Sequence, residues 1–549
     1  MGTTTRRPRW SQAVGALVAL LSILAACSGG NAGGSTTDLD GAVETSAATG
    51  EASEPKTLVI GIQADPNVLN PNLSTNGPVQ QLGTMIYEPL VYFDNEAGGP
   101  KPLLARDWEI SDDGLTYTFH LVDAEFTDGE ELTSTDVKYT LEEVATEYFA
   151  PFAAAAENIE SIDDSDPKTV VIKLKQPFGP FLLSLTRVEI LPEHVFAGTD
   201  VLTNPASTTE PVGTGPFTLA SYTPGVEWVL ERNDGYWQEG YPLLDRIIAR
   251  VVSDSQAAVL ALQTGTIQYI SSQVIAVPDA ISLGEMDHLQ LVPDSFAPNA
   301  TYLMFNVNRE PVNDKRVRQA LFQAVDRKYL HEFVFDGTGN IATAPFDSRL
   351  EWATHPDIDF DEMYPYDPEA AAAALDAAGY PVGPDGKRFT LTFLVEAATR
   401  FQQVAEAVAE MFRAIDVEVK IDAPEYSVTT ERAFTPPGDF DVFIISYTSN
   451  GDPALGIERI YVTGSIGTTL GNASGYSNPE VDRLFEEGRY LTSPEERAVP
   501  YRAVQEILAE DLPSIPLIET KLLDVASTNV EGLWYAANWG QWHRADVTE

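Results

Sequence analysis

The chain has 549 residues and is strongly acidic, with 82 Asp and Glu against 34 Lys and Arg and a net charge of −48 at pH 7. Such a surplus excludes the binding of nucleic acid through neutralised phosphates. The acidic residues run along the whole chain, which favours a solvated acidic surface over a cleft tuned to cationic ligands. The six histidines are scattered without an i, i+4 pair, so the sequence predicts no histidine-built metal site and no cofactor.

The N-terminal segment has the pattern of an export signal. Arg6, Arg7 and Arg9 precede an apolar stretch over residues 13–26, which is shorter than the roughly 20 residues of a membrane-spanning helix. The stretch runs into Leu24-Ala-Ala-Cys27, which contains the only cysteine of the chain. This resembles a bacterial lipobox and implies a lipoprotein signal peptide over residues 1–26, with acyl chains attached to Cys27. The alternative is an ordinary secretory signal with an incidental cysteine.

Residues 27–55 are expected to form a flexible tether. From Ser28 to Pro55 the segment is rich in Gly, Ser, Thr and Ala, and its only large apolar residues are Leu39 and Val43. Such a composition buries too little surface to offset the entropy lost on ordering. A flexible coil of this length spans on the order of 30 Å. The protein is therefore expected outside the cytoplasm, anchored to the outer face of the cell membrane or lying in the periplasm.

Residues 56–549 are too many for one small core and predict at least two domains in which strands and helices alternate. A period-two pattern predicts a strand over 115–121, and Thr133 to Asp136 resembles a capping box that opens a helix. Asp367-Pro368 and Gly379 are typical of the start and end of a helix. The other predicted elements are helices at 317–325 and 404–415 and strands at 217–220, 417–421 and 441–446.

The order of the motifs along the chain resembles the bacterial extracellular solute-binding proteins of family 5, the peptide, nickel and opine group of ABC-transporter proteins. The resemblance covers about residues 58–520. It rests on Ser111-Asp-Asp-Gly-Leu-Thr-Tyr-Thr-Phe-His-Leu121, Phe126-Thr-Asp-Gly129, Gly213-Thr-Gly-Pro-Phe217, Glu231-Arg-Asn-Asp-Gly-Tyr-Trp237, Phe305-Asn306, Val317-Arg-Gln-Ala320, Tyr366-Asp-Pro368, Ala378-Gly-Tyr380 and Ile515-Pro-Leu517. Gly213 and Gly215 lack a following Gly-Lys pair, so a tight turn explains them better than a phosphate-binding loop.

The resemblance implies an α/β fold of two lobes, of the type II periplasmic-binding-protein kind, with an inserted subdomain in lobe I and a hinge between the lobes. The expected ranges are 56–80, 208–305 and 515–549 for lobe I, 81–207 for the insertion and 306–514 for lobe II. A ligand would lie between the lobes, and hinge closure would enclose it.

The loop after the predicted strand at 441–446 is the first candidate binding site. Peptide-binding relatives use an Asp in a similar Gly-Asp-Pro context for the α-ammonium group of the peptide, and Asp452 stands at the matching position. Capping of a helix that starts at Pro453 is the alternative role, and both roles can coexist. Tyr447 and Asn450 would be neighbouring contacts.

Two further segments supply candidates. Dipeptide-binding relatives carry paired arginines for a peptide carboxylate near the segment that contains Arg400, but here Gln402 and Gln403 follow Arg400 and the pair is absent. This departure favours a longer peptide, a peptide-like molecule or an uncharged ligand. Asn76 is a possible lobe I contact, although a plain Asn-Gly turn is the favoured explanation of this position.

The sequence thus predicts a lipid-anchored, monomeric substrate-binding component of an ABC importer that captures a peptide or another oligomeric small solute and delivers it to a membrane permease. An oligosaccharide-binding protein on the same scaffold is the nearest alternative, and a receptor that reports ligand status to a sensor partner is a third. No Gly-x-Ser-x-Gly or His-Glu-x-x-His motif occurs, so an enzyme is not expected.

Overall fold

The computed structural model describes residues 55–94, 99–292, 299–397, 399–533 and 540–548. These residues belong to one compact unit, Pro55–Glu549. The predicted signal peptide, Cys27 and nearly all of the predicted tether lie outside the described residues. None of the helices in the described ranges combines the length and the apolar character that crossing a bilayer requires.

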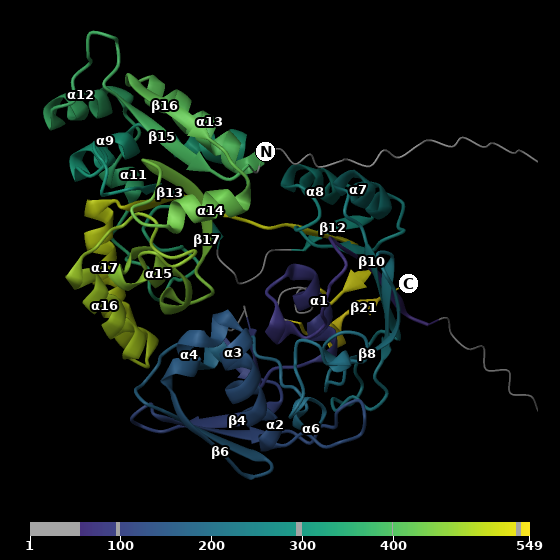
Figure 1. The fold of residues 1–549 in the computed structure, drawn as a ribbon. Coiled ribbons are helices and arrows are strands. Elements are labelled where there is room, and N and C mark those ends of the chain that lie inside the picture. The colour runs from purple at the N-terminus through teal and green to yellow at the C-terminus, as the bar shows by residue number, and fades with distance from the viewer. Residues whose placement is uncertain (1–54, 95–98, 293–298, 398, 534–539, 549) are drawn as a thin grey trace, which may run out of the picture. The chain divides into compact units, whose positions relative to one another are not determined.

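A seven-stranded sheet with the order β12-β19-β11-β1-β10-β9-β8 forms the first layer of the fold (Figure 1). At its centre β1 runs parallel to both β10 and β11, whereas the remaining neighbours are antiparallel. Its strands are β1 (Thr57–Ile62), β8 (Phe217–Thr223), β9 (Glu227–Arg232), β10 (Arg246–Val251), β11 (Tyr269–Ile270), β12 (Leu289–Val292) and β19 (Asp524–Ser527).

A second, six-stranded sheet has the order β14-β18-β13-β17-β15-β16. Its strands are β13 (Asn299–Phe305), β14 (Asn340–Ile341), β15 (Phe389–Val395), β16 (Val417–Asp422), β17 (Val442–Thr448) and β18 (Ser514–Thr520). The sequence ranges given above assign β13 and most of β18 to lobe I, but both strands pair within this second sheet. The division into lobes stays a prediction. The strand pairing favours lobe boundaries that place β13 and β18 in lobe II.

The segment between α1 (Gly77–Ile86) and β8 forms a smaller sheet with the order β4-β5-β7-β6, next to the hairpin of β2 and β3. Tyr117, Phe119 and Leu121 of β5 alternate with less buried residues, as the period-two pattern predicts. The strands are β2 (Val91–Asp94), β3 (Gly99–Pro102), β4 (Ala105–Ile110), β5 (Thr116–Leu121), β6 (Ile159–Asp166) and β7 (Thr169–Leu174), and β20 (Val530–Glu531) and β21 (Asp546–Val547) pair elsewhere.

The helices pack around these sheets. In the first part of the chain they are α2 (Ser134–Tyr139), α3 (Thr146–Tyr148), α4 (Ala153–Asn158), α5 (Phe181–Leu185), α6 (Glu193–Phe196), α7 (Ser255–Gln263) and α8 (Val277–Gly284). In the second part they are α9 (Lys315–Gln323), α10 (Arg327–Tyr329), α11 (Phe360–Met363), α12 (Pro368–Ala378), α13 (Thr399–Arg413), α14 (Tyr426–Phe434), α15 (Glu458–Tyr461), α16 (Pro479–Tyr490) and α17 (Pro494–Asp511).

Local signals in the sequence place several helix ends correctly. Thr133 and Asp136 form the predicted capping box. The Asp367 side chain accepts a hydrogen bond from the Ala370 amide, and Gly379 ends α12 in the left-handed conformation with φ of 99°. Tertiary context changes two details: α2 continues as a π-helical turn at 140–145, and α13 begins five residues before the predicted start.

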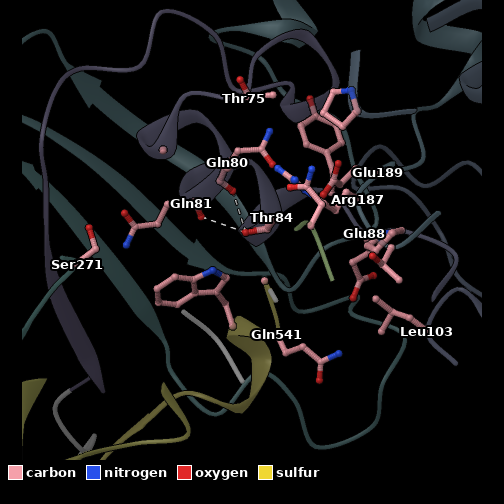
Figure 2. A pocket seen from close by; sticks show the side chains of 18 of the residues that line it. Thr75, Gln80, Gln81, Thr84, Glu88, Leu103, Arg187, Glu189, Ser271 and Gln541 are labelled. Carbon is pink, nitrogen blue, oxygen red and sulfur yellow. Dashed lines mark hydrogen bonds between the residues drawn. The ribbon is translucent and has the colours of Figure 1, made fainter. Parts of the chain in front are cut away.

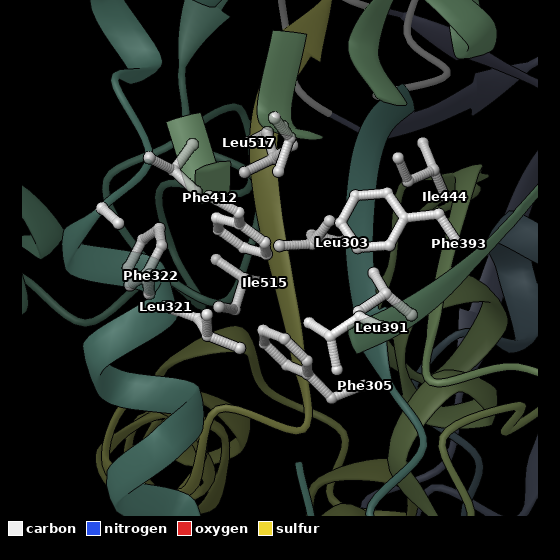
Figure 3. Packing of buried hydrophobic residues seen from close by; sticks show 14 of the residues in the cluster. Leu303, Phe305, Leu321, Phe322, Leu391, Phe393, Phe412, Ile444, Ile515 and Leu517 are labelled. Carbon is white, nitrogen blue, oxygen red and sulfur yellow. The ribbon is translucent and has the colours of Figure 1, made fainter. Parts of the chain in front are cut away.

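The largest buried cluster fills one face of the second sheet. Leu303, Leu391 and Phe393 from the sheet contact Leu321 of α9 and Phe412 of α13 in one apolar layer (Figure 3). Phe393 is fully buried, and its ring meets the Phe412 ring edge-on at a centroid distance of 5.8 Å. Burial of such side chains is the main favourable term in folding, so this layer fixes β15 and β17 and the loop that follows β17.

Candidate functional site

A cavity of about 380 Å³ opens between α1, the inserted segment and the C-terminal part of the chain (Figure 2). Polar side chains of α1 and of the segment at 269–273 line one part of it, and Gln541 enters from the C-terminal segment. Asn450 and Leu455, from the loop after β17, are its lining residues from the range 306–514. The cavity therefore receives side chains from both predicted lobes.

Gly213 and Gly215 allow the chain to pack closely against the end of α1, beside the cavity wall. The Gly215 amide donates to the Ile86 carbonyl at the end of α1 at 2.8 Å, and a Cβ atom at either glycine would lie 2.1 to 2.6 Å from the Ile86 oxygen. Only glycine allows so close an approach of two backbones. The pair therefore packs against the end of α1, directly before Tyr87 and Glu88, and a phosphate-binding role is not needed to explain it.

Glu88 is a buried acid at the cavity wall. Its carboxyl group accepts hydrogen bonds from the Tyr236 hydroxyl at 2.6 Å and from the Trp237 indole at 2.9 Å. Burial raises the pKa of Glu88 to about 7, although both hydrogen bonds act in the opposite direction. Tyr236 and Trp237 thus serve the site by holding Glu88.

Glu189 and Arg187 are the other notable ionisable residues of the cavity wall. Glu189 is 2% exposed, its Oε2 atom has no hydrogen-bond partner, and burial raises its pKa to about 8. Arg187 interacts electrostatically with Glu189 and lies with its guanidinium 5.9 Å from the centre of the Phe149 ring. Among the described residues, no group forms a hydrogen bond or ion pair with that guanidinium.

Further polar groups of the wall are buried without partners in the described structure. They are Nε2 of Gln81, both amide atoms of Gln541 and the indole nitrogen of Trp542. Buried polar atoms in native proteins are nearly always hydrogen-bonded, so a group of unsatisfied ones around one cavity indicates a bound polar molecule or ordered water. Asp524, by contrast, is satisfied by the Tyr269 hydroxyl and the Ser272 amide.

The structure places Asn450 at the cavity and Asp452 away from it. Asn450 lines the wall and has a positive φ of 50°. Its side-chain Nδ2 donates a hydrogen bond to the Leu455 carbonyl at 3.1 Å. Both carboxylate oxygens of Asp452 accept hydrogen bonds from Arg497, and one also accepts the Ala454 amide. This geometry favours the capping role that was the alternative for Asp452, while its role as an ammonium ligand stays a prediction.

The other candidates from the sequence lie elsewhere. The Tyr447 hydroxyl donates to the Gly471 carbonyl within a buried aromatic cluster. Arg400 in α13 donates to the Val334 carbonyl and pairs with Asp336 at 3.5 Å. Asn76 precedes α1 between two lining residues, Thr75 and Gly77, without lining the cavity itself. Of the five ligand candidates, the cavity therefore contains Asn450.

Sequence reasoning missed the acids and amides of the cavity. Glu88 and Glu189 each stand among apolar neighbours, in Tyr87-Glu-Pro-Leu90 and Val188-Glu-Ile-Leu191. A charged residue inside such a run is a signal worth noting, since acids are almost never fully buried unless they are paired. In the described part of the chain, no three His, Cys, Asp or Glu side chains group as metal ligands would.

Comparison with known proteins identifies the family. The model of the bacterial extracellular solute-binding proteins, family 5 (middle region), matches residues 99–467. The chain therefore belongs to this family, whose members are binding proteins and not enzymes. The resemblance drawn from the sequence motifs and the two-lobed α/β fold are both confirmed.

Two curated relatives match along nearly the whole chain. The oligopeptide-binding protein AppA of Bacillus subtilis is 28% identical over 533 residues, which cover 94% of this chain and 95% of the relative. The heme-binding protein A of Haemophilus influenzae is 29% identical over 548 residues, with the same coverage. The solved structure of B. subtilis AppA in complex with a nonapeptide superposes with a TM-score of 0.72 at 27% identity, over 90% of this chain and all of that one.

Proposed function

We propose that this protein captures a peptide or peptide-like solute for an ABC importer and delivers it to a membrane permease. The observation that carries the proposal is the cavity whose wall holds unsatisfied buried polar groups of Glu189, Gln81 and Gln541. Family membership and the named ligands of the relatives, an oligopeptide and heme, support solute binding at such a site.

Capture would proceed by hinge closure. The first sheet and the inserted segment supply most of the wall, whereas Asn450 and Leu455 belong to the range predicted as lobe II. A ligand that contacts both parts only when they approach each other shifts the protein toward the closed form by the difference in its affinity for the two forms. The permease would then recognise that closed form.

Attachment to the membrane would depend on Cys27. Two or more acyl chains hold a protein stably at a bilayer, whereas one chain does so only marginally. Replacing Cys27 with Ser is expected to move the protein from the membrane fraction to the soluble fraction of cells that export it. A Cys27→Ser protein that stays in the membrane fraction would contradict the anchor and leave solute capture untouched.

The direct test of solute capture is mass spectrometry of what the full-length protein carries through a gentle native purification. We expect one class of small solute, released in unaltered form on denaturation. Recovery of a chemically converted product would indicate an enzyme, and recovery of an oligosaccharide would favour the sugar-binding alternative. Protein that carries no solute, and binds none from a nutrient extract, would contradict the proposal.

A further inference from the structure

An acidic and a basic side chain, Glu189 and Arg187, line the cavity without forming an ion pair with each other. Figure 2 shows the labelled side chains of Arg187 and Glu189 beside each other, and the two groups interact electrostatically. No ion pair within 4 Å joins them among the described contacts, and Oε2 of Glu189 has no partner although the residue is 2% exposed. A buried polar atom without a hydrogen-bond partner is costly, so the arrangement fits a molecule that donates to Glu189 and accepts from Arg187.

We propose that the cavity binds a compact zwitterion of the amino-acid type, a free amino acid or a short peptide, with its ammonium group on the Glu189 carboxylate and its carboxylate on the Arg187 guanidinium. This inference rests on the proposed solute-capturing function and names the ligand class of that site. A carboxylate on a guanidinium forms two parallel charge-assisted hydrogen bonds, and an ammonium donates three hydrogen bonds, so each end of the ligand meets a complementary group.

The neutral polar groups of the wall suit the same ligand. The Gln541 amide offers one acceptor and two donors, and Trp542 and Gln81 offer donors, all without partners in the described protein. A peptide or amino-acid backbone carries donors and acceptors that match this mixture. A purely apolar solute would leave all of these groups unsatisfied, which disfavours its binding.

The Glu189 carboxyl group is neutral in the ligand-free protein at pH 7 and would ionise when a cationic group of the ligand binds. Burial raises its pKa to about 8, so the empty site holds the neutral acid at pH 7. A cation placed against the group favours the ionised form and lowers the pKa. The ligand thereby supplies the counter-charge that the protein itself does not place there.

The volume and the position of Asp452 limit the choice further. About 380 Å³ lies near the lower end of the range of about 300–1,000 Å³ for small-molecule sites, which suits an amino acid or a short peptide better than a long one. Asp452, the residue that the family resemblance assigns to an ammonium group, has both carboxylate oxygens on Arg497. Glu189 is the buried carboxyl group of this cavity with an open acceptor atom.

The test uses the full-length wild-type protein, dialysed free of co-purified solute, and three pools of probes. The first pool contains the free amino acids and random di- and tripeptides, the second the same compounds N-acetylated, and the third the same compounds C-amidated. We expect the free pool to raise the melting temperature and to bind at least tenfold more tightly than either capped pool. No stabilisation by the free pool, or equal binding of the capped pools, would overturn the proposal.

Two variants assign the ends of the ligand. Glu189→Gln keeps the shape of the side chain and is expected to weaken binding of the free pool at least tenfold, and Arg187→Met is expected to do the same. Glu157→Gln, which changes an exposed acid of the same inserted segment, is the matched control and should bind as the wild type does. Unchanged affinity in both cavity variants would contradict the proposed contacts.

The outcome also separates this inference from the proposed function. If the free pool fails but native purification yields another solute, such as a polyamine or a sugar, the ligand class is wrong and solute capture stands. If neither the pools nor purification yields a ligand, both fail.

Discussion

Asp452 and Arg497 form a buried bidentate ion pair that ties the loop after β17 to α17. Nη1 of Arg497 lies 2.7 Å from Oδ2 of Asp452 and Nη2 lies 2.6 Å from Oδ1, and both side chains are 5% exposed. Nε of Arg497 donates to the Gly488 carbonyl, and the guanidinium lies 4.9 Å from the centre of the Trp352 ring. The pair fixes the loop that carries Asn450 to the cavity.

Breaking this pair is expected to destabilise the second sheet. Asp452→Ala leaves the buried Arg497 guanidinium without its counter-charge, which costs about 3–5 kcal/mol. Hydrogen exchange of the β17 amides should report the loss as faster opening. The double variant Asp452→Leu with Arg497→Met removes both charges and should recover most of the loss, whereas a double variant as unstable as Asp452→Ala alone would show that the pair is not the cause.

Gly179 joins the inserted segment to the helices of the second part of the chain. Its amide donates to the Arg489 carbonyl at 3.0 Å, and a Cβ atom there would lie 2.5 Å from the Leu491 oxygen and 2.6 Å from Nε of Arg497. Gly179→Ala should therefore force the two parts apart and weaken binding of the co-purified solute at least tenfold by calorimetry. Gly464→Ala, where a Cβ atom meets nothing within 4 Å, is the control, and equal affinity of both variants would refute the contact's role.

Glu88 should make stability depend on pH. Its pKa in the folded protein, about 7, lies above the ordinary 4.5, so between these values the folded state holds a proton that the unfolded state has lost. The contribution of Glu88 to the free energy of unfolding is therefore fully present below pH 4.5. It falls as the pH rises to about 7, by up to about 1.4 kcal/mol per pH unit.

Glu88→Gln is neutral at every pH and should lack that slope. Denaturation curves of the wild type and of Glu88→Gln at pH 5, 6 and 7 measure the difference, which should grow steadily in favour of the variant. Glu157→Gln should follow the wild type. A constant difference between wild type and Glu88→Gln would mean that Glu88 stays ionised throughout.

Phe393 is expected to be a principal core residue of the second sheet. Phe393→Ala removes a fully buried ring that packs on Phe412 and should cost about 3–5 kcal/mol of unfolding free energy. Phe333 offers a matched control, since it is 63% exposed and its loss should cost about 1 kcal/mol at most. Similar losses in both variants would contradict the packing in Figure 3.

Local chemistry made several elements of this fold predictable, whereas the site depends on contacts distant in sequence. The Asp367 cap and the left-handed Gly379 act within one helix, so the sequence pattern sufficed for α12. The sequence pattern places Asp452 correctly in a loop after a buried strand, but its partner Arg497 lies 45 residues further on and no local pattern reveals it. The meeting of Glu189 with Gln541 at one cavity likewise follows only from the tertiary fold.

The central claim, that two lobes close around a solute, is tested most directly by small-angle X-ray scattering. The full-length protein is measured free of ligand and then saturated with the solute identified from native purification. The account predicts a smaller radius of gyration in the saturated sample, and Gly179→Ala should show a weaker response. An identical radius with and without bound solute would contradict hinge closure.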